Sequence, residues 1–474
     1  MSMFDFEFED FDEPADEGRM NALLSAYEGN APAWLDSDSL EDIANYYFEQ
    51  GRYEDALSVI DRLLGIMSHS SDAWMRRGIL LNNLERHKEA LEAYDKALTL
   101  NPVDSETHVN RGITLNALGR SQESLEAYGE AIRIDPINDE AFFNRGVALE
   151  HLNSLQDAVT SFRQCAELNP EHPEVWYELG FCYDCLEKDA ESIVCYERHI
   201  DIEPYSQDAW YNRGIVLSRM SRFETAVDSY DMAIAIQDDF ASAWYNRGNA
   251  LANIGRPEEA IESYRKVIEL EGGDPATWYN LGLAFEEMED YLQAFRYFEQ
   301  VIRQDEAHPE AWYGMGCCLD ALERHEEALA LFDRALALKP DIGEFWHAKA
   351  DCLYNAGNVA EALKTYKHIV STHPKNRDAW LDLAETYFET GHPESALDAY
   401  QKALALHPDA GVHFLQARVL FALGRTDESM HSLKMAFRMD PNMKEELQRV
   451  CPDMWRDAQI RHMLGLGNGP APRV

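Results

Sequence analysis

Eight of the ten tryptophans in the 474-residue sequence are separated by 34 residues or by multiples of 34. His108 and Phe142 fill the two gaps in this series. Four residues after each of these positions lies a small residue, and sixteen residues after that lies an aromatic ring. The small residues are Gly78, Gly112, Gly146, Gly180, Gly214, Gly248, Gly282, Gly316, Ala350 and Ala384. The rings are Tyr94, Tyr128, Phe162, Tyr196, Tyr230, Tyr264, Phe298, Phe332, Tyr366 and Tyr400. A register kept this long predicts an array of like units rather than separate globular domains.

The repeat resembles the tetratricopeptide repeat family, whose 34-residue unit has the pattern W-x2-L-G-x2-Y…A-x3-F…P. The unit over 207–240 reads QDAWYNRGIVLSRMSRFETAVDSYDMAIAIQDDF and has Trp210 and Gly214 in its first half and Ala226 and Tyr230 in its second. The resemblance implies an all-α, right-handed superhelical solenoid of about twelve helix-turn-helix units. We expect it to span 37–441, with a one-residue shift of register in the last unit.

The flanking segments are short. Residues 1–17 contain eight acids and no basic residue, and we expect a disordered acidic and aromatic tail. An alternative is a docking motif built on Phe4, Phe6, Phe8 and Phe11. We expect a short N-terminal helix or cap over 18–36, a C-terminal capping helix over 442–464, and a flexible tail over 465–474. Terminal caps are needed because the end units would otherwise expose an apolar face.

Acidic residues outnumber basic ones 86 to 42, which gives a net charge of −44. Such a chain is not expected to bind nucleic acid or an anionic membrane through bulk electrostatics. No apolar run approaches the length of a membrane span, and the acidic start does not fit a signal peptide. The eight cysteines are scattered, which favours a reducing, cytoplasmic location. The acidity has two explanations that remain open, a basic partner or adaptation to a salty cytosol.

The resemblance implies that the first helix of each unit lines a concave groove with positions 2, 5, 6, 9, 12 and 13 of the unit. In the middle units, position 5 is mostly Tyr and position 6 mostly Asn. The candidate peptide-binding residues are Asn110, Asn144, Tyr177, Tyr211, Asn212, Tyr245, Asn246, Tyr279, Asn280 and Tyr313. This series is similar to the asparagine ladder in the repeat array of O-linked N-acetylglucosamine transferase, which holds a peptide backbone. An amide suits that role because it offers donors and an acceptor. Alternatively, Asn is only a tolerated surface residue here, and Glu178 and Gly314 interrupt the series.

Two further positions carry charge in most units. Position 2 is mostly acidic, as in Asp72, Glu140 and Glu310, which favours a partner segment rich in Lys or Arg. A solvated helix start explains these acids equally well. Position 7 carries Arg in five units, for example in Arg77 and Arg213. We expect these guanidinium groups to pair with acids of a neighbouring helix.

No Ser/His/Asp grouping, phosphate-binding glycine loop or H-E-x-x-H motif is present, so we expect no enzyme activity and no cofactor. Cys182, Cys185, Cys195 and His199 have the chemistry of zinc ligands, but His199 occupies a small-residue slot, which favours packing over a metal site. The remaining cysteines of the array, Cys317, Cys318 and Cys352 among them, are predicted to pack between helices.

We therefore expect a protein–protein interaction scaffold or adaptor that binds an extended or helical segment of a partner. The alternatives are a non-catalytic regulatory or substrate-presenting subunit of an enzyme, and a cytosolic-side component of a secretion or envelope assembly.

Overall fold

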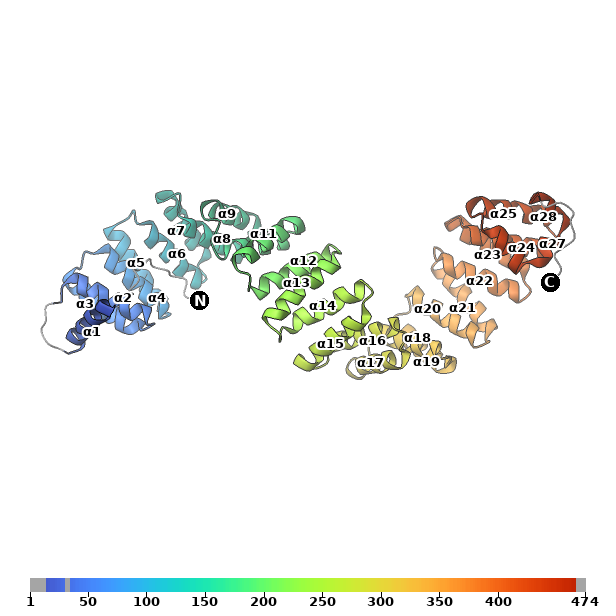
Figure 1. The fold of residues 1–474 in the computed structure, drawn as a ribbon, viewed down its shortest axis with the longest axis horizontal. Coiled ribbons are helices and arrows are strands. Elements are labelled where there is room, and N and C mark those ends of the chain that lie inside the picture. The colour runs from blue at the N-terminus through green and yellow to red at the C-terminus, as the bar shows by residue number, and fades with distance from the viewer. Residues whose placement is uncertain (1–13, 30–34, 466–474) are drawn as a thin grey trace. The chain divides into compact units, whose positions relative to one another are not determined.

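The computed structural model describes residues 14–29 and 35–465. Every regular element in this part of the chain is a helix, and 28 helices follow one another (Figure 1). The prediction of an all-α fold is confirmed. The chain divides into two compact units, residues 1–243 and 244–474, and each is described by itself.

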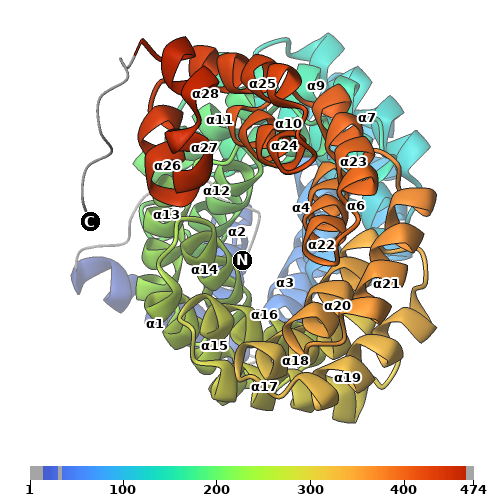
Figure 2. The same ribbon diagram turned by 90° about the vertical axis from the view of Figure 1, so that its right-hand side faces the viewer.

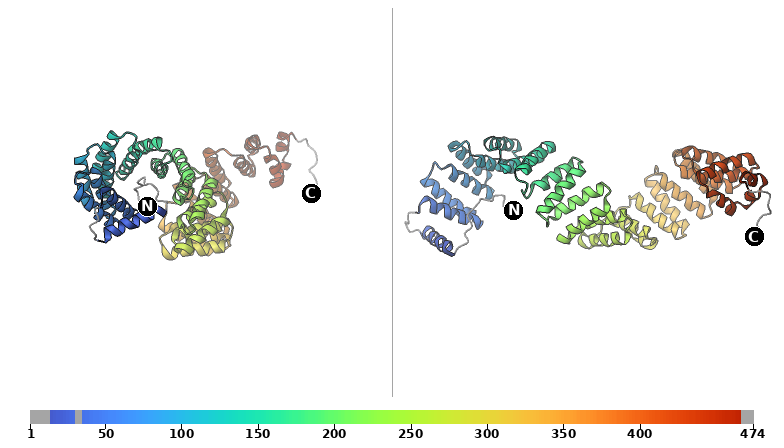
Figure 3. Two further views of the ribbon diagram at one scale, coloured as in Figure 1. Left: turned by 60° about the vertical axis from the view of Figure 1, so that its left-hand side comes forward. Right: turned by 45° about the horizontal axis from the view of Figure 1, so that its top comes forward.

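Twelve helical pairs form the repeats, and each pair has a first and a second helix. In the first compact unit the pairs are α2 (Ser37–Glu49) and α3 (Tyr53–Ile66), α4 (Ser71–Asn83) and α5 (His87–Leu100), α6 (Ser105–Ala117) and α7 (Ser121–Ile134), α8 (Asp139–His151) and α9 (Leu155–Leu168), α10 (Val175–Cys185) and α11 (Asp189–Ile202), and α12 (Gln207–Arg219) and α13 (Phe223–Ile236). From the junction onward they are α14 (Ala241–Asn253) and α15 (Pro257–Glu271), α16 (Pro275–Glu287) and α17 (Tyr291–Gln304), α18 (Pro309–Ala321) and α19 (His325–Leu338), α20 (Gly343–Asn355) and α21 (Val359–Thr372), α22 (Arg377–Glu389) and α23 (Pro393–Leu406), and α24 (Ala410–Ala422) and α25 (Thr426–Met439). Figure 3 shows the pairs stacked side by side within each compact unit.

The turn between the two helices of a pair always contains one residue with a left-handed backbone. In the described part of the chain this residue is the fifteenth of its repeat in all twelve repeats. Six are glycines (Gly51, Gly119, Gly255, Gly357, Gly391 and Gly424) and six are not (Glu85, Asn153, Glu187, Ser221, Glu289 and Glu323). Glycine adopts this conformation without a steric cost, whereas the other residues must be held in it by the helices on either side. The position of Gly424 also confirms the one-residue shift in the last repeat.

The conserved spacing between the small residue and the ring is a direct contact. A methyl group added at Gly214 would lie 2.5 Å from Cε1 of Tyr230, and the other seven glycines of this series show distances of 2.4–2.8 Å to their rings. The ten rings are at most 3% exposed. The first helix therefore needs a glycine, because the ring of the second helix packs directly on its backbone. In two later repeats, Ala350 and Ala384 occupy this slot.

The tryptophans tie each repeat to the loop before it. The indole nitrogen of Trp210 donates a hydrogen bond to the carbonyl oxygen of Pro204, six residues earlier, at 3.0 Å. Trp176, Trp346 and Trp380 make the same bond to a proline carbonyl, and Trp74 and Trp312 bond to other residues at the same offset. The Trp and Pro positions of the repeat pattern are thus joined in the structure.

The first helices of neighbouring repeats also contact one another directly. These contacts join α4 to α6, α6 to α8 and α10 to α12 in the first compact unit, and α16 to α18 and α18 to α20 in the second. In the second unit, Figure 2 shows α16, α18, α20 and α22 on the inner side of the stack and α17, α19 and α21 on the outer side. We call the surface formed by positions 2, 5, 6, 9, 12 and 13 of the first helices the inner face.

Shorter elements cover the two ends. Residues 1–13 lie outside the described residues, and α1 (Pro14–Glu28) already begins within the segment expected to be a tail. Leu23, Leu24 and Tyr27 of α1 pack against the core of the first repeat. No helix in the described residues has both the length and the apolar character needed to cross a membrane.

The prediction of a single capping helix over 442–464 is wrong. Three short helices occupy this segment: α26 (Met443–Val450), α27 (Pro452–Arg456) and α28 (Ala458–Met463). Pro452 cannot sit inside a helix without losing a hydrogen bond and clashing, so it starts a new one. Asp457 ends α27 and accepts hydrogen bonds from the backbone of α28. The buried side chains of Leu447, Met454 and Ile460 form one cluster with those of α24 and α25, so the segment still covers the last repeat.

Candidate peptide-binding surface

The tyrosines predicted at position 5 lie on the first helices with their rings against the ring of the same repeat. The ring centroids of Tyr177 and Tyr196 are 5.9 Å apart, and those of Tyr245 and Tyr264 are 6.0 Å apart. Tyr211, Tyr279 and Tyr313 make the same contact with Tyr230, Phe298 and Phe332. All five position-5 tyrosines are half-buried. Since one side of each ring is fixed by packing, its orientation on the inner face is set by the repeat.

Two of the predicted asparagines are bonded to tyrosines of the preceding repeat. The side-chain nitrogen of Asn212 in α12 donates to the hydroxyl oxygen of Tyr177 in α10 at 3.1 Å. Asn280 in α16 makes the same bond to Tyr245 in α14 at 3.0 Å. These pairs join position 5 of one repeat to position 6 of the next. The sequence prediction missed this link, although the 35-residue offset between Tyr and Asn could have indicated it.

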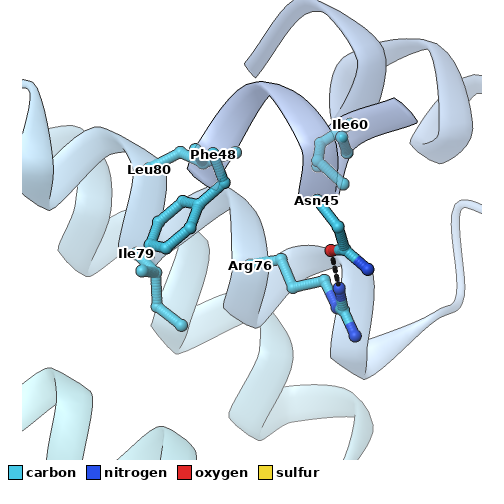
Figure 4. A pocket seen from close by; sticks show the side chains of 7 residues that line it. Asn45, Phe48, Ile60, Arg76, Ile79 and Leu80 are labelled. Atoms are coloured by element: carbon cyan, nitrogen blue, oxygen red, sulfur yellow. Dashed lines mark hydrogen bonds between the residues drawn. The ribbon is translucent and has the colours of Figure 1, made fainter. Parts of the chain in front are cut away.

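Position 9 supplies a further partner that the sequence prediction did not single out. Asn249 accepts hydrogen bonds from Asn280 at 3.0 Å and from the hydroxyl of Tyr264 at 2.8 Å. The equivalent Asn45 accepts from Arg76 at 2.7 Å, beside the ring of Phe48 (Figure 4). In both places a position-9 amide carbonyl orients the position-6 side chain of the next repeat.

The other predicted asparagines have different surroundings. Asn110 and Asn144 are only 5% and 4% exposed. Asn144 donates to the backbone and side-chain oxygens of Glu140 within its own helix, at 2.9 and 3.2 Å. Asn246 is half-buried on α14. The asparagines with accessible side-chain surface are therefore Asn212, Asn246 and Asn280.

The internal bonds leave defined hydrogen-bonding capacity on two amides. Asn212 uses one N–H on Tyr177, so a second N–H and the carbonyl oxygen remain for a ligand. Asn280 directs its nitrogen to both Tyr245 and Asn249, and its carbonyl oxygen remains. A peptide backbone presents both donors and acceptors, so the two amides suit alternating groups of an extended chain.

The tyrosines keep their protons and act as hydrogen-bond donors or acceptors. Burial raises the pKa of Tyr279 to about 12. Its ring lies 5.6 Å from Phe298 and 5.1 Å from His308, centroid to centroid. The hydroxyl of Tyr313 donates to Glu344 of the next repeat at 3.3 Å, and its ring stacks on Phe345. Glu344 thereby holds an acidic group beside the tyrosine series.

One pair of carboxyl groups lies on the inner face of the first compact unit. Glu178 occupies the asparagine slot of α10, and Glu150 lies near the end of α8. Burial, followed by the charge of Glu150 and a hydrogen bond to it, raises the pKa of Glu178 to about 8. Two carboxylates at this separation repel each other, so Glu178 holds a proton near neutral pH.

The position-2 acids are partly neutralised within the chain. Asp72 accepts from Arg76 at 2.9 Å, and Glu310 pairs with Lys339 at 2.5 Å. An imidazole nitrogen of His172 lies 3.7 Å from Glu140. These contacts give the position-2 acids a structural role at the helix starts, in addition to any effect on a ligand.

The position-7 arginines pair with acids 16 residues earlier, on the second helix of the preceding repeat. Arg77 contacts Asp61 at 2.8 Å, and Arg111 contacts Asp95 at 2.9 Å. Arg213 contacts Glu197 at 2.7 Å in the same way. The expected pairing with a neighbouring helix is confirmed for these three. They join adjacent repeats on a surface separate from the position-5 and position-6 side chains.

The cysteine cluster of the fifth repeat does not form a metal site in the described residues. Cys182, Cys195 and His199 are buried and Cys185 is exposed, and no three of their ligand atoms gather within 4.8 Å. Burial raises the pKa of the Cys182 and Cys195 thiols to about 12. These side chains behave as packing residues, as the small-residue slot of His199 indicates.

Models of one repeat family match much of the chain. Those described as tetratricopeptide repeat match residues 71–104, 139–172, 241–274, 279–341 and 353–419, and one described as TPR repeat matches 114–153. Together the matched segments cover more than half of the sequence. A comparison with curated protein sequences finds no match.

Several solved structures are similar to parts of the chain. YrrB, described as a TPR protein with an unusual peptide-binding site, is 20% identical over 40% of this chain and 96% of its own, with a TM-score of 0.38. The Cut9–Hcn1 hetero-tetramer of the APC/C gives 15% identity over 82% of this chain and 97% of that one, with a TM-score of 0.41. A tetratricopeptide repeat protein from Parabacteroides merdae gives 15% identity over 56% of this chain and 98% of its own, with a TM-score of 0.43.

Proposed function

Because the chain belongs to the tetratricopeptide repeat family, we propose that it is a protein–protein interaction scaffold whose inner face binds an extended segment of a partner protein. The family matches support the general role of a scaffold. The finer statement, that an extended segment binds to the Tyr and Asn side chains, rests on their arrangement. Eight free cysteines support a reducing compartment such as the cytoplasm.

The observation that carries the proposal is the fixed orientation of the inner-face amides. Asn212 and Asn280 are each held by a tyrosine hydroxyl of the preceding repeat. A ligand that binds them does not have to order these side chains first, and this lowers the entropic cost of association. Bonding to a peptide backbone does not depend on the partner's side chains. Such a surface therefore selects an extended chain, while neighbouring groups select its sequence.

The charge of the inner face supports a basic segment as the ligand. Glu150 and Glu178 are a carboxyl pair that a proton holds together near neutral pH. A Lys or Arg side chain placed between them would replace this proton and bind two carboxylates. Glu344 extends the acidic character into the second compact unit, beside Tyr313. The net charge of −44 would also speed the approach of a basic segment.

Selection from a random peptide library displayed on phage tests this function, with the immobilised full chain as the target. We expect enrichment of peptides with Lys or Arg and without the three-to-four-residue periodicity of an amphipathic helix. A parallel selection on the Glu150→Gln, Glu178→Gln chain should lose part of the preference for basic residues. Enrichment of acidic or amphipathic helical peptides would contradict the proposal, and so would a selection that yields no common pattern.

A further inference from the structure

Three metal-ligating side chains from two neighbouring repeats converge in the second compact unit. Asp320 lies near the end of α18, His325 is the first residue of α19, and Cys352 lies on α20. One ligand atom of each lies within 4.8 Å of the other two. Nδ1 of His325 is 2.7 Å from a carboxylate oxygen of Asp320. The thiol of Cys352 donates to the backbone oxygen of His325 at 3.5 Å.

The same three repeat positions converge in the first compact unit with different chemistry. Asn82, His87 and Thr114 are separated by the same 5 and 27 residues along the sequence. The carbonyl oxygen of Asn82 lies 2.9 Å from Nδ1 of His87 and accepts a hydrogen bond from Thr114 at 2.9 Å. The backbone of the repeat therefore brings these three positions together, whatever side chains they carry.

We propose that Asp320, His325 and Cys352 bind one zinc(II) ion, with water in the fourth position. Carboxylate, imidazole and thiolate are the three zinc ligands that proteins use, and three protein ligands plus water is the usual open tetrahedral arrangement. The neutral amide of Asn82 and the hydroxyl of Thr114 are much weaker ligands, so the matching triad is expected to remain a hydrogen-bonded one. The site is independent of the proposed peptide binding.

The dimensions of the triad suit a tetrahedral ion. Zinc bonds of about 2.0–2.3 Å place ligand atoms roughly 3.3–3.7 Å apart, so the Asp320–His325 contact would open by less than about 1 Å. The Asp320 and His325 side chains are 23% and 22% exposed, which gives an ion access from solvent, whereas Cys352 is fully buried. The thiol loses its proton when the metal binds, so binding releases one proton to solvent.

A second group of three possible ligands lies nearby and serves as a control. His347 contacts Asp382 at 2.6 Å and lies 3.7 Å from Asp351, which accepts from Tyr366 at 2.5 Å. This group has no sulfur, and its histidine is already paired with a carboxylate between repeats. Zinc held by the Asp320 site would carry a thiolate, and zinc held by this group would not, so the two are distinguishable by spectroscopy.

Metal titration of the full chain after removal of metals with a chelator tests the site. Zinc affinity is measured by competition with a chromophoric chelator, and cobalt(II) is used to detect a thiolate-to-metal absorption band. We expect one equivalent of bound zinc and a thiolate band with cobalt. The Asp320→Asn and Cys352→Thr variants recreate the side chains of the first unit's triad. They should therefore keep the fold, lower zinc affinity more than about tenfold, and in Cys352→Thr abolish the band. Cys451→Ser and His347→Gln should change neither the affinity nor the band.

The converse variant makes the test independent of any loss of stability. Asn82→Asp with Thr114→Cys, at an unchanged His87, should create a second site and raise the stoichiometry from one zinc to two. The proposal is overturned if the wild-type chain binds no zinc against the chelator, if cobalt shows no thiolate band, or if only His347→Gln weakens binding. Circular dichroism confirms that each variant keeps its helices.

Discussion

The side-chain nitrogen of Asn212 lies 3.1 Å from the hydroxyl oxygen of Tyr177, 35 residues earlier in the chain and one repeat away. The bond joins two first helices across the boundary between repeats. It has two consequences, because it holds the repeats together and also fixes an amide that remains partly open to a ligand. Asn280 and Tyr245 repeat the arrangement in the second compact unit.

Tyr177→Phe removes this bond and leaves the packing of the ring intact. We expect a loss of about 0.5–1.5 kcal/mol in the free energy of unfolding, which is the usual net value of one hydrogen bond. Affinity for a selected peptide should also fall, because Asn212 would no longer be oriented. Urea unfolding and fluorescence polarisation measure the two effects. Tyr205→Phe is the matched control, since Tyr205 is 81% exposed, and an equal loss in both variants would contradict the role of the bond.

Gly214→Ala tests the contact between the two helices of a repeat. The added methyl group would lie 2.5 Å from the ring of Tyr230, so the ring or the helix must shift. We expect a cost of about 1–3 kcal/mol, as for other overpacked cores. Hydrogen exchange should localise the effect to α12 and α13, because repeat arrays are stabilised by nearest-neighbour contacts.

Gly129→Ala is the control for this substitution. Gly129 lies within α7, and no atom lies within 4 Å of the position that its Cβ would take. Alanine is the better helix former, so this variant should gain about 0.5–1 kcal/mol. The contact account would be wrong if both glycines responded with the same sign.

Glu178→Gln tests the carboxyl pair through the pH dependence of stability. The pKa of Glu178 is raised from the ordinary 4.5 to about 8, so the folded chain keeps a proton that the unfolded chain releases. Stability contributed by this residue therefore falls as pH rises from about 4.5 to about 8, by at most about 1.4 kcal/mol per pH unit. Glutamine removes the titration.

The measurement is the urea midpoint of the wild type and the Glu178→Gln variant from pH 5 to 8. The variant should gain stability over the wild type as pH rises, because it is spared the repulsion from Glu150. Glu203→Gln, at an exposed position, controls for the change in net charge. Parallel curves for the wild type and Glu178→Gln would refute the raised pKa.

Trp210→Phe tests the link between a repeat and its preceding loop. Phenylalanine keeps most of the packing and loses the bond to the carbonyl oxygen of Pro204. We expect a cost of about 0.5–1.5 kcal/mol for the bond, plus the loss of contact area of the larger ring. Exchange of the backbone amides around residue 206 should become faster. Unchanged exchange there would show that the loop is held by other contacts.

Much of the fold could be predicted from spacing alone, because each recurring residue meets a recurring partner in the structure. The 16-residue interval between Gly214 and Tyr230 is a contact, and the tryptophan and proline positions are joined by a hydrogen bond. Pro452 also carried a signal, since a proline inside the expected capping helix marks the start of α27.

The contacts between repeats were harder to predict. A column of Asn and Tyr indicates one helical face, but the bond between Asn212 and Tyr177 depends on how far one repeat is rotated against the next. The convergence of Asp320, His325 and Cys352 depends on the same rotation and on the turn before α19. Reading a single repeat shows neither. For this reason Cys352 appeared to be a packing residue in the sequence.

The central claim is that the inner-face amides bind the backbone of an extended basic segment. The most direct test is the affinity of one library-selected peptide for the chain carrying Asn212→Ala, Asn246→Ala and Asn280→Ala. The control chain carries Asn101→Ala, Asn358→Ala and Asn442→Ala, which lie outside the inner face. We predict that the first chain keeps its helicity and binds the peptide at least about tenfold more weakly, the equivalent of about 1.4 kcal/mol, while the control binds as the wild type does. Equal affinity of both variants, with helicity intact, would contradict the claim.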